Sequence, residues 1–266
     1  MTILNYKKIG TGDTSIIVLH ELMGSCANYE AIFPYLDTTK FTYYFTDLRG
    51  YGLSKEIKGE YSCNEASNDI NNLITHLNLS SVHIVAHSMS TMIAQKLALI
   101  DDRVKQLILI TPISAAGIKM KPEAQAKLIE SMKKNENLIE HVVESASKRY
   151  NKPWRDYRIK MGYEASTLEA RTGYMTMYLT TDFIEEVKDI KVPIKIILGH
   201  HDLPAFHKNN VKKQFDGYYN DFEIIECMEA GHYPMIECPV YFATKVEEFI
   251  SNYQNQSLED INSLNS

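Results

Sequence analysis

Short apolar runs alternate with segments of helical spacing along most of this chain. The runs are rich in β-branched and aromatic residues and are bounded by turn residues, which is typical of strands buried on both faces of a sheet. We expect strands over residues 3–9, 15–20, 41–46, 81–87, 106–111, 194–198 and 222–225. Residues 62–77 instead repeat their apolar positions every three to four residues, which predicts an amphipathic helix. Strands that alternate with helices predict an α/β fold, with a mostly parallel sheet of about seven strands flanked by helices.

The pattern changes between residues 113 and 190, where helical segments dominate. Helices are expected there over residues 122–134, 138–150, 165–179 and 183–188, and in the following part over 206–215 and 239–253. We therefore predict a core of residues 1–112 and 191–253 and an inserted helical cap of residues 113–190. The insertion would roof the carboxyl edge of the sheet, where ligands of open α/β sheets bind. Residues 254–266 are polar and are expected to be disordered.

The composition excludes several functions. At 266 residues and 44% hydrophobic, the chain can bury a large core. A net charge of −6 without a cluster of Lys or Arg argues against nucleic acid as a partner. There is no N-terminal signal pattern, and no apolar run approaches the roughly 18 residues of a membrane span, so we expect a cytoplasmic protein without a membrane partner. The four cysteines lack C-x-x-C spacing, which predicts reduced thiols and no metal site.

One strand-to-helix junction carries a candidate nucleophile. The apolar run 81–87 leads into Ala-His-Ser-Met-Ser at residues 86–90, and helical spacing follows directly. Ser88 is therefore placed on the turn between strand and helix. A nucleophile elbow needs this geometry, and its usual pattern is G-x-S-x-G. Ala86 and Ser90 replace both glycines, but they are small enough for a tight turn. A serine at a helix start is also a common N-cap, so this stretch alone does not decide between the two interpretations.

A base and an acid occur at corresponding places later in the chain. A serine hydroxyl needs an adjacent base, which is itself oriented by a carboxylate. Asp202 lies in the loop after the strand 194–198, and His232 lies in the loop before the last helix. All three residues therefore lie at carboxyl ends of strands, on one edge of one sheet. Their order along the chain, Ser then Asp then His, is that of α/β-hydrolases.

The sequence resembles the α/β-hydrolase fold family over nearly its whole length. The matching segments occur in the family's order at residues 19–25, 47–54, 86–90, 199–202 and 231–239. The second and the last are close to the family's D-x-R-G-x-G-x-S and G-H-x-P-x-x-E-x-P. The resemblance implies the α/β-hydrolase fold and a serine hydrolase of the esterase or lactonase type, which acts on a small or medium carboxylic ester, thioester or lactone without a cofactor or metal.

The resemblance also implies a role for each matching residue. Ser88 would be the nucleophile, His232 the general base and then acid, and Asp202 the orienting carboxylate. The backbone N–H groups of Leu22 and Met89 would form the oxyanion hole. The family's alternative place for the acid, in the loop after the strand 106–111, contains no carboxylate in this chain.

Glu21 departs from the family's pattern, which has glycine after the corresponding histidine. A carboxylate there would repel an oxyanion if it pointed inward, so we expect it to point outward and bond a neighbouring backbone group or the cap. The exchange keeps other reactions open: a cofactor-free lyase or oxygenase with the same triad, or a small-molecule receptor. For the receptor, the support is Ser90, two residues after the nucleophile.

Several further residues are assigned from their positions. Glu21, Tyr174 and Tyr178 are expected at the substrate pocket, the two tyrosines because they lie one helical turn apart in the cap. Most other apolar residues of the cap are expected to form its core. Asp47 and Arg49 are expected in a turn-stabilising network rather than an ion site. The chain is expected to be a monomer or a homodimer whose partner is a small molecule.

Overall fold

The computed structural model describes the backbone of residues 2–135, 138–146 and 149–264, with side chains up to residue 255. Its centre is a sheet in the order β1-β3-β2-β4-β5-β6-β7. The strands are β1 (Tyr6–Ile9), β2 (Thr14–Leu19), β3 (Phe41–Thr46), β4 (Val82–His87), β5 (Val104–Ile110), β6 (Ile194–Gly199) and β7 (Phe222–Cys227). Strand β1 pairs antiparallel with β3, and all other pairs are parallel. This confirms the predicted seven-stranded, mostly parallel sheet.

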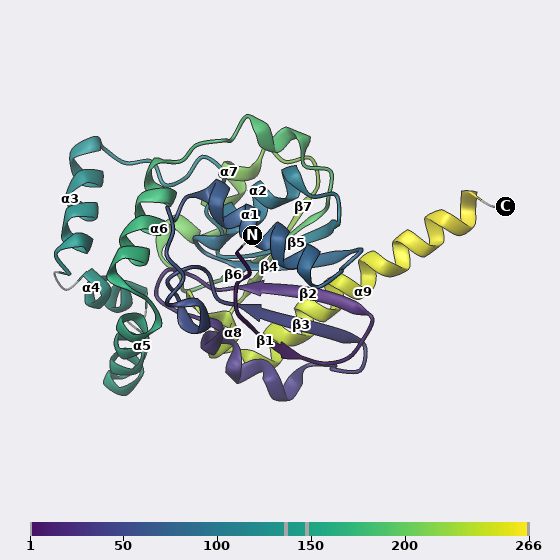
Figure 1. Cartoon of the computed structure of the whole chain (residues 1–266), viewed down its shortest axis with the longest axis horizontal. Coiled ribbons are helices and arrows are strands. Elements are labelled where there is room, and N and C mark those ends of the chain that lie inside the picture. The colour runs from purple at the N-terminus through teal and green to yellow at the C-terminus, as the bar shows by residue number, and fades with distance from the viewer. Residues whose placement is uncertain (1, 136–137, 147–148, 265–266) are drawn as a thin grey trace.

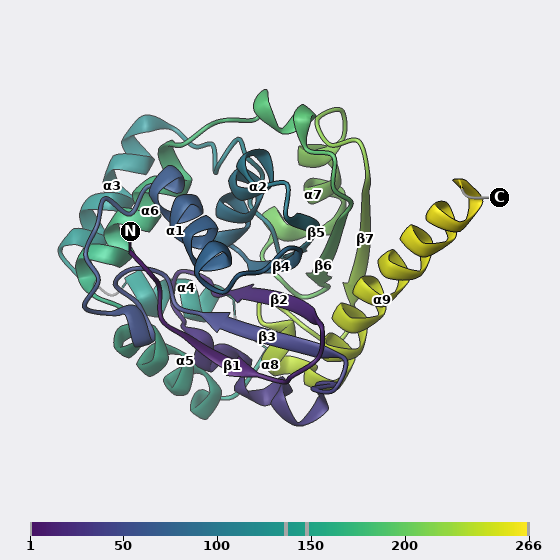
Figure 2. The same ribbon diagram turned by 45° about the vertical axis from the view of Figure 1, so that its right-hand side comes forward.

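Both faces of the sheet are covered, which explains why its strands are continuously apolar. Along β4, Ile84 and Ala86 belong to one core cluster, whereas Val85 between them belongs to another on the opposite face. On the first face lie α1 (Cys63–His76), α2 (Ser90–Ile100) and α7 (Lys208–Phe215). On the second lie η1 (Cys26–Tyr35), α8 (Pro234–Glu237) and α9 (Pro239–Leu264) (Figures 1 and 2).

Two short helices, η2 (Gly52–Ser54) and η4 (Pro204–Phe206), follow β3 and β6; the remaining described helices lie between β5 and β6 in the chain, within the segment predicted as a cap. They are α3 (Pro122–Lys133), α4 (Leu138–Ala146), α5 (Lys152–Ala165) and α6 (Leu168–Thr180), followed by the short η3 (Glu186–Asp189). In Figure 1, α3 to α6 gather at the end of the molecule toward which the arrowheads of β2 and β3 point. The arrowheads mark the carboxyl ends of the strands, so α3 to α6 lie at the carboxyl edge of the sheet; they are called the cap below.

Two helices differ from the sequence expectation. Helix α5 was not predicted, because its apolar residues do not repeat on one face; the local signals were Asn151, whose side chain accepts the Trp154 N–H at 3.2 Å, and Pro153 in the first turn. The expected disorder from residue 254 stays a prediction, but the last helix is also longer than the predicted 239–253, since α9 continues to Leu264. The reason is that the sequence after Pro239 contains no Gly or Pro to end a helix.

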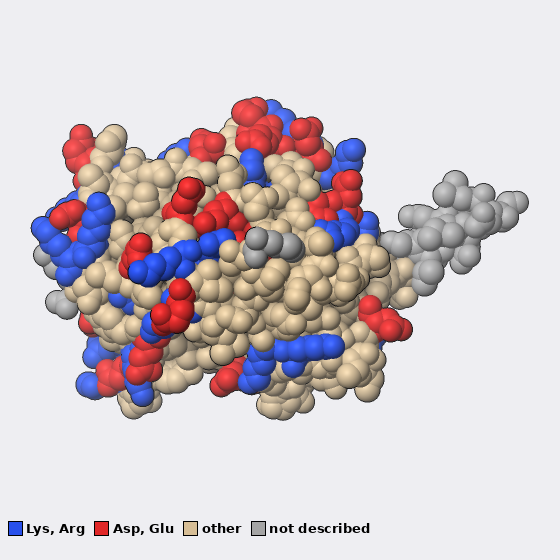
Figure 3. All heavy atoms as spheres, viewed as in Figure 1, with Lys and Arg blue, Asp and Glu red and all other residues tan. Residues whose placement is uncertain are grey.

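The surface carries charges of both signs. On the face shown in Figure 3, Lys and Arg are interspersed with Asp and Glu rather than gathered into one basic region of the described residues. None of the described helices combines the length and the apolar character that a bilayer-crossing segment needs.

Candidate active site

Ser88 occupies a strained turn between β4 and α2. Its φ is +52°, in the left-handed region that costs a non-glycine residue about 1–3 kcal/mol. The turn is held on both sides, because the Ser88 N–H donates to Ile110 O at 2.9 Å and the Ser88 carbonyl accepts the Thr91 N–H at 3.0 Å. Backbone strain that the surroundings enforce is typical of functional positions. The turn places Ser88 at the wall of a cavity at the carboxyl edge of the sheet.

The small residues on either side of Ser88 belong to the turn. Ala86 and Ser90 are fully buried. The Ser90 hydroxyl accepts the His87 N–H at 3.0 Å and lies 3.0 Å from the His87 carbonyl, to which it can donate. Ser90 is not among the residues that line the cavity. Its hydroxyl is therefore engaged by the backbone of the turn and does not line the cavity.

Asp202 and His232 form a buried, hydrogen-bonded pair. Asp202 follows β6 and His232 follows β7, and the His232 Nδ1 lies 2.8 Å from the Asp202 Oδ2. The other carboxylate oxygen of Asp202 accepts the Leu203 N–H at 2.6 Å. A carboxylate that accepts from Nδ1–H leaves Nε2 unprotonated, as a general base requires. His232 and Ser88 line the same cavity, although no hydrogen bond between their side chains forms among the described residues. Such bonds are often long before substrate binds.

A close backbone contact brings the loops of the two residues together. Gly199 ends β6, three residues before Asp202. A Cβ atom at Gly199 would lie only 1.8 Å from the carbonyl oxygen of Gly231. A larger residue would therefore push the His232 loop away from Asp202.

Carboxylates around His232 favour its charged form. Burial by itself lowers the pKa of this histidine, but the charge and hydrogen bond of Asp202, together with the charges of Glu21 and Glu237, outweigh burial and raise it above the usual 6.5. The imidazolium that forms when the base takes a proton is thereby stabilised.

We expect kcat/KM for an uncharged ester to fall with decreasing pH through a midpoint above about 6.5. The base must be neutral to accept the Ser88 proton, and a raised pKa of His232 means that neutrality is lost at a higher pH than for a free imidazole. A profile of kcat/KM between pH 5 and 9 measures this midpoint. A midpoint below 6, or a flat profile, would contradict the assignment of His232.

The backbone on both sides of His232 is fixed by two other side chains. Glu237 of α8 accepts the Gly231 N–H at 2.7 Å and the Tyr233 N–H at 3.0 Å. His87 Nε2 lies 2.8 Å from the His232 carbonyl, and burial lowers the pKa of His87 well below its usual value, so a neutral ring donates there. Sequence reasoning gave Glu237 no role. The available signal was an acidic residue in the short helix directly after the candidate base.

Two backbone donors remain free near Ser88. His20 Nε2 accepts the Leu48 N–H at 3.1 Å, so its Nδ1 carries the proton and donates to the Glu21 carbonyl at 2.7 Å. Because C=O and N–H of a trans peptide point in opposite directions, the Leu22 N–H points away from His20. Within the described residues, neither the Leu22 N–H nor the Met89 N–H meets an acceptor. Both N–H groups therefore remain without an acceptor among the described residues, and their role as oxyanion donors stays a prediction.

The cavity at Ser88 is small and mostly apolar. Its volume is about 290 Å³. The apolar wall combines core residues such as Leu22 and Met23 with cap residues such as Met175 and Leu179. Its polar or titratable lining side chains are Glu21, Ser88, Tyr178, His232 and Tyr233, and none of its described lining residues is Lys or Arg.

Glu21 is buried beside this cavity, with 2% of its surface exposed. Its carboxylate accepts the Met23 N–H, accepts the Asn28 side-chain amide at 2.8 Å and pairs with Arg158 Nη2 of the cap at 3.1 Å. Glu21 thus bonds both a neighbouring backbone group and the cap, as expected, but it points into the protein rather than outward. The buried guanidinium makes the inward position possible.

Only one of the two tyrosines assigned to the pocket lines it. Tyr178 is at the cavity wall, whereas Tyr174 lies outside it. The Tyr174 ring packs against Tyr51 and Tyr61, with centroids 5.8 and 5.6 Å away. One helical turn shifts a side chain by about 5.4 Å along the axis, which is enough to move it past the edge of a small cavity.

The other predicted polar network stabilises a turn. Asp47 accepts the Cys26 N–H at 2.6 Å and the Leu53 N–H at 2.8 Å, and Arg49 pairs with Asp69. No group of three or more potential metal ligands occurs among the described His, Cys, Asp and Glu residues.

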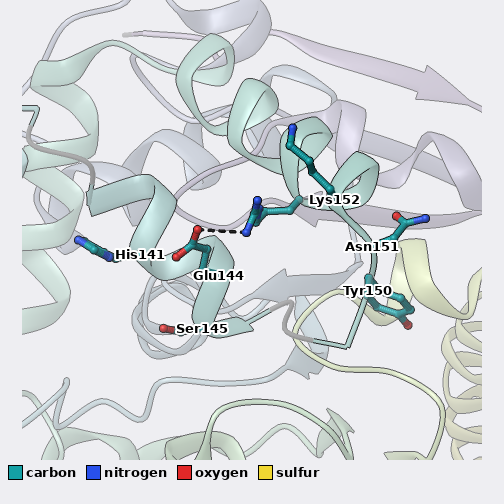
Figure 4. A pocket seen from close by; sticks show the side chains of 7 residues that line it. His141, Glu144, Ser145, Tyr150, Asn151 and Lys152 are labelled. Carbon is teal, nitrogen blue, oxygen red and sulfur yellow. Dashed lines mark hydrogen bonds and ion pairs between the residues drawn. The ribbon is translucent and has the colours of Figure 1, made fainter.

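A second hollow lies on the outer surface of the cap, between α4 and α5 (Figure 4). It has a volume of about 500 Å³ and contains an ion pair between Glu144 and Arg155 at 3.3 Å. It shares none of its lining residues with the cavity at Ser88. This hollow is larger than the cavity at Ser88, but it contains none of the candidate catalytic residues.

Comparison with known proteins agrees with this fold. The model of a family described as alpha/beta hydrolase fold matches residues 14–156. An esterase from Exiguobacterium antarcticum is similar in structure, with a TM-score of 0.81, 20% identity and coverage of 92% of this chain and 94% of that one. An enol-lactonase from Burkholderia xenovorans LB400 has a TM-score of 0.75 at 21% identity and 93% and 96% coverage. A bromoperoxidase from Bacillus anthracis has a TM-score of 0.79 at 18% identity and 92% and 94% coverage.

Proposed function

This chain belongs to the alpha/beta hydrolase fold family, and from that premise we propose that it is a serine hydrolase of a small or medium carboxylic ester, thioester or lactone. One observation carries the proposal. His232, bonded to the buried Asp202 at 2.8 Å, lines the same cavity as Ser88 on its strained turn. A nucleophile, a base and an orienting carboxylate together form the machinery of acyl transfer.

The proposed reaction has two halves. In the first, the Ser88 oxygen attacks the substrate carbonyl while its proton passes to His232 Nε2. The N–H groups of Leu22 and Met89 bind the oxyanion, and His232 then protonates the leaving alcohol or thiol. In the second half, His232 takes a proton from water, the resulting hydroxide attacks the acyl-enzyme, and His232 returns a proton to Ser88. The acid leaves and the enzyme is restored.

The cavity favours an uncharged, apolar acyl group. Its wall is mainly aliphatic, and its volume lies at the lower end of the roughly 300–1,000 Å³ of ligand pockets. The described lining residues include no Lys or Arg that would pair with a substrate carboxylate. Desolvation of a charged acyl group would therefore not be compensated.

Two assays test the proposal. With p-nitrophenyl esters from acetate to decanoate, we expect steady-state turnover with an optimum at a short or medium chain, and slower turnover of an ester that carries a second, free carboxylate. A fluorophosphonate should label the protein, and peptide mass spectrometry should locate the label on Ser88. Absence of both turnover and labelling in the folded protein would contradict the proposal. An anionic ester preferred over its neutral counterpart would overturn the assigned substrate class.

The alternative proposal is a non-hydrolytic reaction that uses the same three residues. The observation that favours it is the presence of a glutamate where the family has glycine in the oxyanion loop. Labelling of Ser88 without hydrolysis of any ester in the series would support this alternative.

A further inference from the structure

A single cap residue, Arg158, contacts three segments of the core beneath it. Its side chain lies in α5 and is completely buried. Nη2 pairs with Glu21 Oε1 at 3.1 Å, and Nη1 donates to Asn28 Oδ1 at 2.8 Å. The guanidinium carbon lies 3.9 Å from the centre of the Tyr233 ring. These partners belong to the loop after β2, to η1 and to the loop after β7.

The buried charges of Glu21 and Arg158 depend on each other. A buried guanidinium or carboxylate without a partner is strongly unfavourable, so each of these two groups is tolerated because the other is present. The absence of a side chain at Gly24 leaves room for the Glu21 carboxylate and its partner Asn28. A Cβ atom at Gly24 would lie 1.9 Å from the Asn28 amide nitrogen and 2.6 Å from Glu21 Oε1.

The positions of the partners connect this pair to the proposed chemistry. Glu21 immediately precedes Leu22, the proposed oxyanion donor, and Tyr233 immediately follows the proposed base His232. The Glu21 carboxylate binds the Met23 N–H, Asn28 and Arg158. These three partners leave the Leu22 N–H free for the substrate oxygen. Without the guanidinium, an uncompensated negative charge would remain beside the place where a second negative charge develops.

We propose that Arg158 is a positioning residue, through which the cap neutralises Glu21 and holds the oxyanion loop and the base loop in their reactive arrangement. The inference rests on the proposed function, because it assigns Arg158 a role in that same reaction. Arg158 itself does not touch the substrate cavity. Its contribution should therefore appear in the rate of the chemical step rather than in substrate binding.

The test is a double-mutant cycle with Arg158→Met, Glu21→Gln and the combined variant. We expect Arg158→Met to lower kcat about 100-fold, comparable to the loss of one oxyanion donor, with KM changed by less than about threefold. The combined variant should recover at least about tenfold of this loss, since neither uncompensated charge remains. Arg155→Met is the matched control: it lies on the same helix and breaks the exposed pair with Glu144 drawn in Figure 4, so kcat should not change.

A pH profile separates positioning from a merely structural role. The charged groups that affect His232 are Asp202, Glu21 and Glu237, with neutral His87 against the loop. Loss of Arg158 leaves Glu21 uncompensated, so the pKa of His232 should rise and the acidic limb should move to higher pH. Glu21→Gln should move the limb to lower pH. A variant that is only less stable would shift neither limb.

The rate of fluorophosphonate labelling at Ser88 provides a readout that requires no knowledge of the substrate. Arg158→Met should be labelled more slowly than wild type, and Arg155→Met at the wild-type rate. If Arg158→Met does not fold, Arg158→Lys replaces it; this variant keeps the charge but loses the two-nitrogen contact, so labelling should slow while the acidic limb stays in place.

The two hypotheses fail in different ways. An unlabelled and inactive wild type would contradict the proposed function. An active wild type with unchanged kcat and labelling rate in Arg158→Met, or in Arg158→Lys where that variant replaces it, would overturn the role of Arg158 alone. A combined variant no faster than Arg158→Met would do the same.

Discussion

Replacement of Ser88 by alanine is expected to reduce kcat for p-nitrophenyl esters by roughly 10⁵- to 10⁶-fold, as removal of the nucleophile does in characterised serine hydrolases. Without the hydroxyl, no acyl-enzyme can form, and only the oxyanion donors and substrate binding remain to assist water. The fold should be unaffected, because the turn is held by backbone atoms of Ser88: its N–H bonds Ile110 and its carbonyl bonds Thr91. The measurement is kcat at equal enzyme concentration, together with Tm.

The matched control is Ser145→Ala, an exposed serine on α4 that lines the outer hollow of the cap (Figure 4). It should keep full activity. Residual activity of Ser88→Ala within about 100-fold of wild type would show that a different residue is the nucleophile.

The second large effect is expected from Asp202→Asn, with kcat reduced roughly 10³- to 10⁴-fold. The amide can present N–H to the His232 ring in place of the carboxylate oxygen, which favours the tautomer that cannot accept the Ser88 proton. Removal of the negative charge also removes the interaction that raises the pKa of His232. The acidic limb of the remaining activity should therefore lie at a lower pH than that of the wild type. The measurement is kcat and the pH profile of kcat/KM.

Asp216→Asn is the control for this variant. Asp216 pairs with Lys212 on the exposed side of α7, at 2.7 Å. Its loss should change kcat by less than about twofold, because exposed ion pairs contribute little. An Asp202→Asn variant that retains wild-type kcat would place the orienting carboxylate elsewhere.

The sheet could be predicted from the sequence because its signal is local. Residues of β4 such as Ile84 and Val85 face opposite sides, and both sides are covered, so the strand appears as an unbroken apolar run. The proposed triad was equally accessible. Ser88, Asp202 and His232 each follow a strand, and parallel strands end at one edge, so order along the chain was sufficient to place them together.

The cap could not be resolved in the same way. Helix α5 lacks one apolar face, because it buries the charged Arg158 among core polar groups rather than in an aliphatic layer. A buried charge is recognisable only together with its partner, and Glu21 is 137 residues away in the chain. Helical periodicity likewise could not distinguish Tyr174 from Tyr178, because both lie on the same face of one helix.

The sequence by itself determined the parallel sheet, because each strand is an apolar run. It also determined the edge at which Ser88, Asp202 and His232 lie, because each of the three follows a strand. Only the tertiary structure decided that Tyr178 and not Tyr174 reaches the cavity, that Glu237 holds the backbone around His232, and that Arg158 pairs with Glu21. These are contacts between elements distant in the chain. Their geometry depends on how the cap helices pack over the sheet, and the burial that makes a charge pair or a hydrogen bond decisive exists only once that packing has formed.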